Sequence, residues 1–251
     1  MMHFVQSKID KLRSRLADRF FEFKPYIAGL AIEGCPLRFF YGTPQAAEWY
    51  DPLQPHTRIE LEWLARHVAG RREKIIDAGA YHGLYTLVLA KAADPASEVV
   101  AVDPVPSNGV LIEVNLALND LHARIEACAI SDRDGEVAFA PGSCGRIVAR
   151  GGSIRAARRL EAVLPDATVV KLDIEGTEFA LFPEQIDVLP TAHTWIVEIH
   201  PRKGRNPRMI LDAFTARGFE LQWVDRGNRR LATYPANAPW QSRTSLIAVR
   251  S

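Results

Sequence analysis

Two short stretches of the sequence combine an apolar run with residues that could bind a charged ligand. In KIIDAGAYHGLYTL the run ends in Asp77, Gly79 and Gly83, and in EVVAVDPVPSN it ends in Asp103. Glycines let a backbone approach a ligand closely, and an acid about twenty residues further on can accept the hydroxyls of a ribose. The two stretches therefore predict a site for an adenosine cofactor.

The spacing of the glycines favours one cofactor over another. A dinucleotide fingerprint reads G-x-G-x-x-G, whereas this chain reads D-A-G-A-Y-H-G and has Asp77 in place of the first glycine. An acid there would repel a pyrophosphate, but it suits a cofactor with an ammonium and a sulfonium group, such as S-adenosylmethionine. A nicotinamide oxidoreductase is therefore disfavoured. The alternative is that the glycines serve only a tight turn between strand and helix.

Strands must carry these residues to one edge of a sheet. From Arg71 onward, short apolar runs alternate with helical stretches, which predicts an α/β domain over residues 71–251 with a parallel sheet covered on both faces. Two final strands, FELQWVDR and TSLIAVRS, suggest an antiparallel finish. The stretch PGSCGRIVARGGSIRAARR is rich in Gly, Ser and Arg and is expected to be a loop-like insertion.

Residues 1–70 form a predicted N-terminal extension. It begins with a basic amphipathic helix, in which Val5 to Phe20 supply an apolar stripe at helical spacing. We expect this stripe to pack on the domain, with binding to an anionic membrane surface as the alternative. A small hairpin over LAIEGCPLRFFYG and a helix ending at Gly70 follow.

Composition limits the classes of partner. The 251 residues are 47% hydrophobic and 24% charged, with a formal net charge of +1, so no nucleic-acid partner is expected. The three cysteines are odd in number and lack CxxC spacing, which argues against a disulfide framework and a zinc site. No apolar run approaches the roughly 18 residues of a spanning helix, and no signal-peptide pattern is present. These features predict a cytoplasmic protein without stable membrane insertion.

Five stretches in order carry a family resemblance. IIDAGAYHGLYTL resembles the first motif of class I methyltransferases, and VAVDPVPSN resembles an acidic second motif. NLALN resembles an N-x-x-x-N helix, ACAISDRDGEVAF an A-x-S-D-x-x-G-x-x-x-F stretch, and VVKLDIEGTEF a K-x-D-x-E-G-x-E signature. Over roughly residues 71–200 the chain thus resembles the FkbM-type methyltransferase family. It departs from the pattern at Tyr81, where the family usually has Asn, and at Asp103, where Glu is more frequent.

The resemblance implies a Rossmann-like class I methyltransferase fold, with a mostly parallel seven-stranded sheet, an antiparallel last strand and an N-terminal helical extension. It also implies that Asp77 and the glycine loop hold the methionine part of S-adenosylmethionine, that Asp103 binds the ribose, and that the segment at Cys128 borders the adenine. The residues implied to bind the cofactor are Asp77, Gly79, Ala80, Tyr81, Gly83, Thr86, Asp103, Cys128, Ala129, Ser131 and Asp132.

Methyl transfer is an in-line displacement that requires alignment and, for a hydroxyl acceptor, a base. Asp173 ends a predicted strand and is the best-placed acid of KLDIEGTE. Glu198 and His200 share a face of the next strand, and a histidine with an ordinary pKa of about 6.5 is the more natural base near neutral pH. The predicted catalytic residues are therefore Asp173, Glu198 and His200. The same three side chains could form a divalent metal site, an alternative that the sequence does not favour.

The expected reaction follows from the family resemblance. It is methylation of a hydroxyl on a sugar, polyketide or other specialised metabolite, so the expected partner is a small molecule or a glycan. Alternatives are methylation of a nitrogen or a carboxylate on a similar acceptor, and a cofactor-binding module without catalysis. The sequence leaves the acceptor, the oligomeric state and the role of Tyr81 and His82 open.

Overall fold

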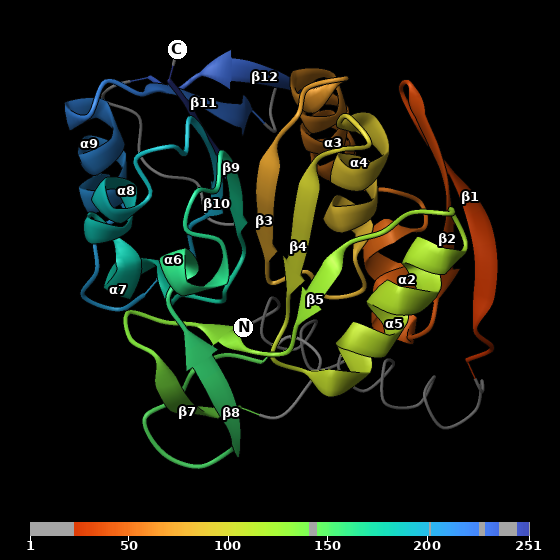
Figure 1. Ribbon diagram of the computed structural model, residues 1–251, viewed down its shortest axis with the longest axis horizontal. Helices are drawn as coiled ribbons and strands as arrows, with labels where there is room; N and C mark the ends of the chain where they lie inside the picture. The colour runs from red at the N-terminus through yellow and green to blue at the C-terminus, as the bar shows by residue number, and fades with distance from the viewer. Residues whose placement is uncertain (1–22, 141–144, 201, 226–228, 236–244, 251) are drawn as a thin grey trace, which may run out of the picture.

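The computed structural model describes residues 23–140, 145–200, 202–225, 229–235 and 245–250 (Figure 1). The predicted amphipathic helix with its Val5 to Phe20 stripe lies outside these ranges. Within them, no helix has both the length and the apolar character that crossing a membrane requires.

Eight strands form the central sheet: β3 (Lys74–Ala78), β4 (Glu98–Val102), β5 (Arg124–Glu126), β9 (Val169–Leu172), β10 (Thr194–Glu198), β11 (Glu220–Asp225), β12 (Arg230–Thr233) and β13 (Ser245–Val249). They lie in the order β12-β11-β13-β10-β9-β3-β4-β5 (Figure 1). The strands from β10 to β5 are parallel, whereas β13 is antiparallel to both β10 and β11. The predicted mostly parallel sheet with an antiparallel last strand is confirmed. Among the described residues it has eight strands instead of seven, because β12 adds an antiparallel edge to β11.

Strand order reverses at β3. The chain passes from β3 to β4 on one side and returns later to β9 on the other, so the loops after β3 and β9 diverge at the same sheet edge. Such a switch point opens a crevice in which ligands of α/β proteins bind. Asp77 within β3 and Asp173 directly after β9 are thereby brought to one place.

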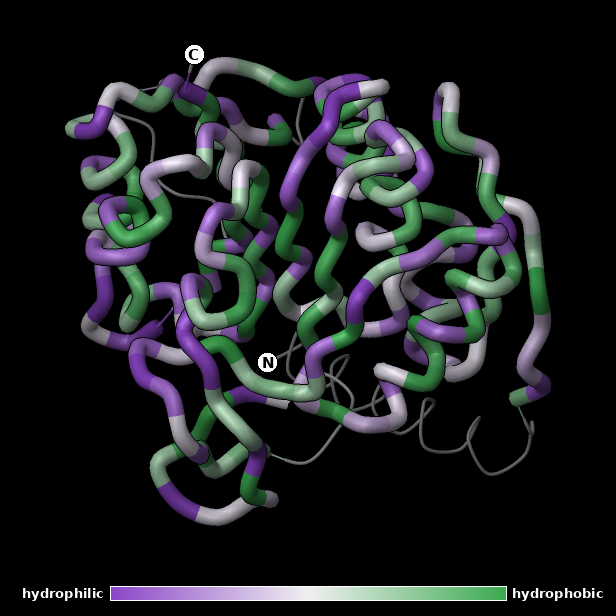
Figure 2. The backbone as a smooth tube through the Cα atoms, viewed as in Figure 1, coloured by the Kyte–Doolittle hydropathy of each residue, from purple (hydrophilic) through white to green (hydrophobic). Residues whose placement is uncertain are grey.

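Both faces of the sheet are buried, which explains the continuous apolar runs of its parallel strands. Ile75 and Val169 pack on one face in a cluster that includes residues of α3 and α4, and Ile76 and Val170 pack on the other face with α6 to α9. Figure 2 shows the hydrophobic colour along these central strands. The helices are α2 (Pro44–Tyr50), α3 (Pro55–Val68), α4 (Leu84–Ala92), α5 (Pro106–Ala117), α6 (Leu160–Val163), α7 (Glu178–Leu181), α8 (Glu184–Val188) and α9 (Arg208–Ala216).

The expected loop-like insertion contains a strand. β8 (Ser153–Arg158) pairs antiparallel with β7 (Gly135–Phe139) and parallel with β6 (Ala129–Ile130), and this three-stranded sheet projects beside the open edge of the central sheet (Figure 1). The run RIEACAIS is divided between β5 in the large sheet and β6 in the small one. The Gly and Arg content of this stretch therefore did not predict β8, whose antiparallel partner β7 lies about twenty residues earlier in the sequence.

The expected hairpin is β1 (Tyr26–Ile32) paired with β2 (Cys35–Tyr41), and it shares a core with α4 and α5. Two asparagines four residues apart, Asn115 in α5 and Asn119 in the turn that follows it, attach the hairpin to the domain. Asn115 accepts from the Phe40 N–H at 2.7 Å and donates to the His82 carbonyl at 2.8 Å, while Asn119 bonds both backbone groups of Arg38 at 2.8 and 2.7 Å. The two side-chain amides of the N-x-x-x-N pattern thus form hydrogen bonds with the backbone of β2. The division at residue 70 stays a prediction.

Asn115→Ala is expected to lower the free energy of unfolding by about 2–3 kcal/mol. It leaves the buried His82 carbonyl and the partly buried Phe40 N–H without partners, and an unpaired buried group costs about 1–3 kcal/mol. Asn119→Ala is the matched control and should cost less than about 1 kcal/mol, since water can replace its amide at a partly exposed position. Urea unfolding followed by circular dichroism measures both. Equal losses in the two variants would contradict this assignment.

Candidate active site

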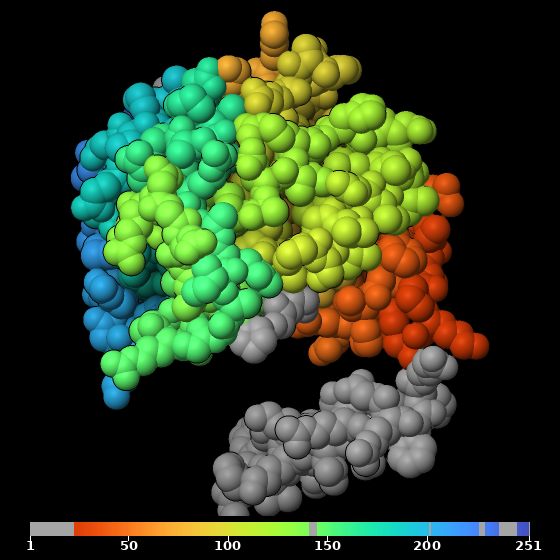
Figure 3. All heavy atoms as spheres, turned by 60° about the horizontal axis from the view of Figure 1, so that its bottom comes forward, coloured from red at the N-terminus to blue at the C-terminus, as the bar shows by residue number. Residues whose placement is uncertain are grey.

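A cavity of about 840 Å³ opens at the carboxyl ends of the parallel strands. Figure 3 shows this end of the molecule, with the green β7–β8 hairpin on one side and the red and orange N-terminal segment on the other. The volume lies in the upper part of the ~300–1,000 Å³ range of small-molecule sites. Its wall is formed by strand ends, the loops that follow them, α2 and α4. It includes Trp49, Tyr50, Gly79, Tyr81, Tyr85, Asp103, Val105, Cys128, Ala129, Arg146, Lys171, Asp173, Glu175, Glu198, His200 and Arg202.

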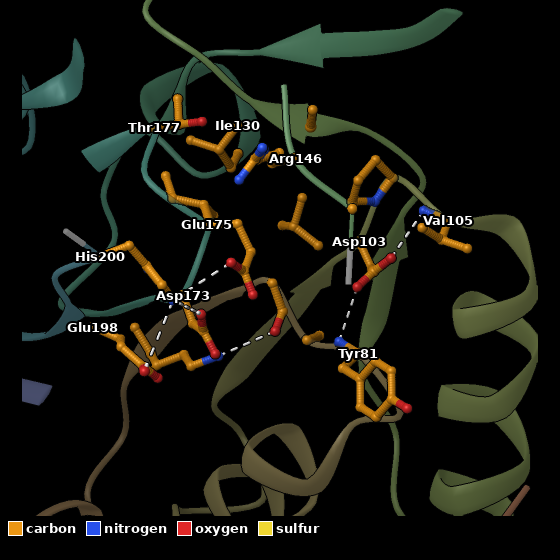
Figure 4. A pocket seen from close by; sticks show the side chains of 18 of the residues that line it. Tyr81, Asp103, Val105, Ile130, Arg146, Asp173, Glu175, Thr177, Glu198 and His200 are labelled. Carbon is orange, nitrogen blue, oxygen red and sulfur yellow. Dashed lines mark hydrogen bonds and ion pairs between the residues drawn. The ribbon is translucent and has the colours of Figure 1, made fainter. Parts of the chain in front are cut away.

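Asp103 directly follows β4 and faces the cavity while being only 6% exposed. Its carboxylate accepts from the N–H groups of Tyr81 and Val105, both at 2.9 Å (Figure 4). It also accepts from the Asn108 amide at 3.0 Å. A carboxylate offers about four acceptor positions, so about one remains for an incoming hydroxyl. Burial raises the pKa of Asp103 to about 6, although these three donors oppose the shift.

The glycine loop is shaped by contacts within the protein. Gly79 has φ +76, and a Cβ at this position would lie 1.8 Å from the Asp173 carbonyl oxygen. Its N–H and that of Ala80 donate to the Val102 carbonyl, and the N–H of Gly83 donates to the Ala80 carbonyl. The glycines therefore allow the loops after β3 and β9 to meet, and Gly79, Ala80 and Tyr81 also line the cavity.

Asp77 and Thr86, which the sequence placed at the methionine end, lie behind the cavity wall. Both are fully buried, and the Thr86 hydroxyl donates to Asp77 Oδ2 at 2.6 Å. The Lys171 ammonium lies 3.3 Å from Asp77 Oδ1 and donates to the Gly79 carbonyl at 3.1 Å. Asp77 thus acts on the cavity through Lys171, which does line it.

Lys171 is a site residue that sequence reasoning missed. Burial works against its charge, but the carboxylates of Asp77 and Asp173 outweigh that effect and raise its pKa. Its ammonium also lies 4.9 Å from the centre of the Tyr85 ring. The sequence did contain a signal for Lys171. It lies within the apolar strand VVKL, and a lysine buried in a sheet requires an acidic partner.

Cys128 and Ala129 border the cavity, as expected for the adenine end. Ser131 and Asp132 follow the last lining residue of that segment and bond to each other at 3.0 Å. Tyr81, at the departure from the family pattern, has φ +52, and its ring stacks on His82 at 3.7 Å. His82 is 1% exposed, and burial lowers its pKa to about 4. It is therefore an uncharged side chain of the core behind Tyr81.

Four carboxylates surround His200 near the ends of β9 and β10, and Figure 4 labels three of them, Asp173, Glu175 and Glu198. Its Nδ1 lies 3.0 Å from Glu178 Oε1. Its Nε2 lies 3.6 Å from Asp173 Oδ1, 3.7 Å from Glu175 Oε2 and 3.8 Å from Glu198 Oε1. The three side chains predicted to be catalytic therefore share one wall of the cavity with Glu175, and Glu178 lies fully buried behind His200.

The charge state of His200 differs from the sequence expectation. Burial disfavours its charge, but the hydrogen bond to Glu178 and the charges of Asp173 and Glu198 prevail and raise its pKa to about 9. Burial, with the charge of Asp173, raises the pKa of Glu198 to about 8. At neutral pH His200 is thus protonated in this arrangement, which is the opposite of what a free base requires.

Further aromatic and basic side chains divide between the cavity and other parts of the molecule. Trp49 and Tyr50 line the cavity, with the Trp49 ring 5.3 Å from the Tyr81 ring, whereas Trp63 stacks on His67 elsewhere. Arg146 and Arg202 line the cavity. Arg158 and Arg159 instead pair with acids on the surface, Arg158 with Glu126 and Arg159 with Asp134 and Glu161.

The reversal of strand order at β3, the antiparallel β13 and the cavity at the carboxyl edge define a class I methyltransferase fold. A protein-family model described as the methyltransferase FkbM domain matches residues 77–221, so the chain belongs to that family.

Solved structures agree on the fold. An S-adenosylmethionine-dependent methyltransferase from Agrobacterium tumefaciens matches 92% of this chain and 72% of its own, with a TM-score of 0.54 and 14% identity. A 16S rRNA N2 G1207 methyltransferase from T. thermophilus, in complex with AdoMet and guanosine, matches 92% of this chain and 52% of its own, with a TM-score of 0.50 and 15% identity. A methyltransferase FkbM from Methylobacillus flagellatus KT matches 70% of this chain at 14% identity and a TM-score of 0.47, and the match spans 43% of that protein. No curated protein matches the sequence.

Lys171→Met is expected to lower the free energy of unfolding by about 3–5 kcal/mol, because it leaves the Asp77 carboxylate buried without its cation. Adding Asp77→Asn should restore part of this loss, since no lone charge then remains. The control is Lys74→Met, which removes an exposed ion pair to Asp166 and should change stability by less than about 1 kcal/mol. Chemical denaturation of the three variants checks this order of stability. A double variant that is no more stable than Lys171→Met would contradict the pairing of Lys171 with Asp77.

Proposed function

We propose that this protein transfers the methyl group of S-adenosylmethionine to a hydroxyl oxygen of a small acceptor, such as a sugar, a polyketide or another specialised metabolite. The observation that carries the proposal is that one cavity joins Asp103, at the position of a ribose-binding acid, to Asp173, at the strand switch point. The family membership supports S-adenosylmethionine as the methyl donor. We infer a hydroxyl as the acceptor from the acids at the end of the cavity opposite Asp103. A cytoplasmic location is proposed with it.

The residues present fit the cofactor. The acceptor position left on Asp103 suits a ribose hydroxyl, and the segment from Cys128 to Ile130 supplies an apolar wall for the adenine. The acids near Asp173 suit the positive sulfonium and ammonium groups. When bound, S-adenosylmethionine supplies an activated methyl group, and the protein has to hold it and exclude water.

Asp173 is the base in this proposal. Its carboxylate is about one-third exposed, lies on the cavity wall and is oriented by Lys171 at 3.9 Å and His200 at 3.6 Å. The acceptor oxygen forms a bond to the methyl carbon as the bond from carbon to sulfur breaks, and S-adenosylhomocysteine leaves. The hydroxyl proton passes to the Asp173 carboxylate, which balances the step.

The aromatic wall supports a small acceptor. Trp49, Tyr50, Tyr81 and Tyr85 line the end of the cavity that lies against α2 and α4. Flat apolar faces beside carboxylates suit a molecule with both ring surface and hydroxyl groups. A nitrogen or carboxylate acceptor is the alternative, because neither would need the base in the same way.

Asp173→Asn is expected to lower kcat for methyl transfer by about 10²–10⁴-fold, the usual contribution of a general base, while affinity for S-adenosylhomocysteine stays within about three-fold. Release of S-adenosylhomocysteine is measured over a panel of sugars, polyketides, amines, acids and RNA. Asp120→Asn makes the same chemical change at an exposed position and is the control. Cofactor binding without turnover on any acceptor would favour a non-catalytic module, and turnover on RNA alone would overturn the small-acceptor proposal.

Cofactor affinity should fall as the pH drops through about 6. The folded Asp103 has a raised pKa of about 6, so the carboxylate that accepts hydroxyl hydrogen bonds is present above this pH and is lost below it. Between pH 7.5 and 5 we expect about a ten-fold weaker affinity for S-adenosylhomocysteine in calorimetry. Asp103→Asn should bind more weakly at every pH and lose this dependence. A pH profile that is the same in both proteins would assign the dependence to another group.

A further inference from the structure

Three ligand-type atoms converge on the cavity wall beside the proposed acceptor position. One carboxylate oxygen each from Asp173 and Glu175 and one ring nitrogen of His200 lie within 4.8 Å of one another. Nε2 of His200 is 3.6 Å from the nearest Asp173 oxygen and 3.7 Å from that of Glu175. Ligands about 2.1 Å from an octahedral ion are about 3.0 Å apart along an edge, so modest side-chain rotations would bring these atoms onto one ion.

We propose that Asp173, Glu175 and His200 bind a divalent cation at this position. Two carboxylates and one imidazole form an oxygen and nitrogen set suited to Mg²⁺, Mn²⁺ or Zn²⁺. The set differs from the alternative that the sequence offered, because Glu175 takes the place of Glu198. The inference deepens the proposed function, on which it rests for the acceptor, and the cation binding itself is separable from it.

Glu178 supplies an independent observation in favour of a ligand. It is fully buried, and its Oε1 receives the Nδ1–H of His200 at 3.0 Å, which leaves Nε2 directed towards Asp173 and Glu175. Histidines that bind metals commonly donate their other ring N–H to a carboxylate in this way. The second oxygen, Glu178 Oε2, is buried without a hydrogen-bond partner among the described residues. A buried carboxylate oxygen without a partner, beside the three ligand-type atoms, favours a cation near them.

The backbone holds Glu175 in an unusual conformation. Glu175 has φ +57, a left-handed value that costs a side-chain-bearing residue about 1–2 kcal/mol, and Gly176 follows with φ +95. Arg202 stabilises the turn by donating from Nη2 to the Glu175 carbonyl at 3.1 Å. The turn aims the carboxylate at His200 instead of at solvent, so the side chain is positioned before any ligand arrives.

The local charges favour a cation with two charges. His200 has four carboxylates around it, and the ammonium of Lys171 lies 3.3 Å from Asp77 and 3.9 Å from Asp173. The carboxylates around His200 also attract a metal ion. A cation here would have open positions facing the cavity. It would supply a Lewis acid to which an acceptor hydroxyl can bind, which lowers the pKa of that hydroxyl.

Metal binding to the full-length, metal-stripped protein tests the proposal without any turnover. MnCl₂ is added, free Mn²⁺ is followed by electron paramagnetic resonance, and MgCl₂ and ZnCl₂ are titrated by calorimetry. We expect one saturable Mn²⁺ site per chain, weakened at least about ten-fold in Asp173→Asn and in Glu175→Gln. The matched control is Glu48→Gln, which removes a negative charge from the same cavity wall outside the set and should leave the affinity within about two-fold.

Two outcomes would overturn the proposal. One is the lack of saturable binding of all three ions up to about 1 mM, the weak end of protein sites for such ions. The other is that Glu198→Gln weakens Mn²⁺ binding as much as Glu175→Gln, which would assign a different ligand set. Thermal unfolding of each variant excludes misfolding, and Asp173 and Glu175 are both partly exposed, so their amides are tolerable replacements.

A titration with S-adenosylhomocysteine on the same samples separates this proposal from the proposed function. Intact cofactor affinity without Mn²⁺ binding overturns the metal site alone. Saturable Mn²⁺ binding without cofactor affinity supports the metal site and overturns the methyl-transfer proposal.

Discussion

The buried ammonium of Lys171 is the interaction on which the open edge of the sheet depends. It joins the carboxylate of Asp77 on β3 to that of Asp173 after β9, and it bonds to the Gly79 carbonyl between them. These two strands are the ones between which the strand order reverses, so the crevice opens where Lys171 lies. Without a cation here, the fully buried carboxylate of Asp77 would have no counter-charge in a dry interior, where unpaired charge is costly.

The same edge shows how one charge sets the state of its neighbours. Asp173 contacts Lys171 on one side and His200 on the other, and it raises the pKa of both. Glu178, fully buried, orients His200 from behind. The site is therefore a chain of paired charges in which the carboxylate of Asp173 reaches the cavity, and this explains why the apparently natural base, His200, is the more heavily protonated partner.

Much of the fold was predictable from local patterns, and so was the sheet edge at which the cavity opens. Apolar strands alternating with helices predicted the parallel sheet, because strands buried on both faces are apolar throughout. The missing first glycine and Asp77 indicated the right cofactor class, although Asp77 acts from behind Lys171 and the glycines serve the contact with the Asp173 carbonyl. The strand β8 was missed, because its pairing with β7 depends on residues distant in the sequence and not on its own Gly and Arg content.

The sequence by itself determined the class of fold, the edge of the sheet where the site lies and the identity of its acids, since periodicity and strand ends are local properties. Only the tertiary structure decided which of those acids meet. Glu175 joins Asp173 and His200 through a left-handed turn, and Glu178 reaches His200 from a helix that follows a different strand. Protonation was likewise decided in three dimensions, because a pKa depends on burial and on charges that the fold brings within a few ångströms.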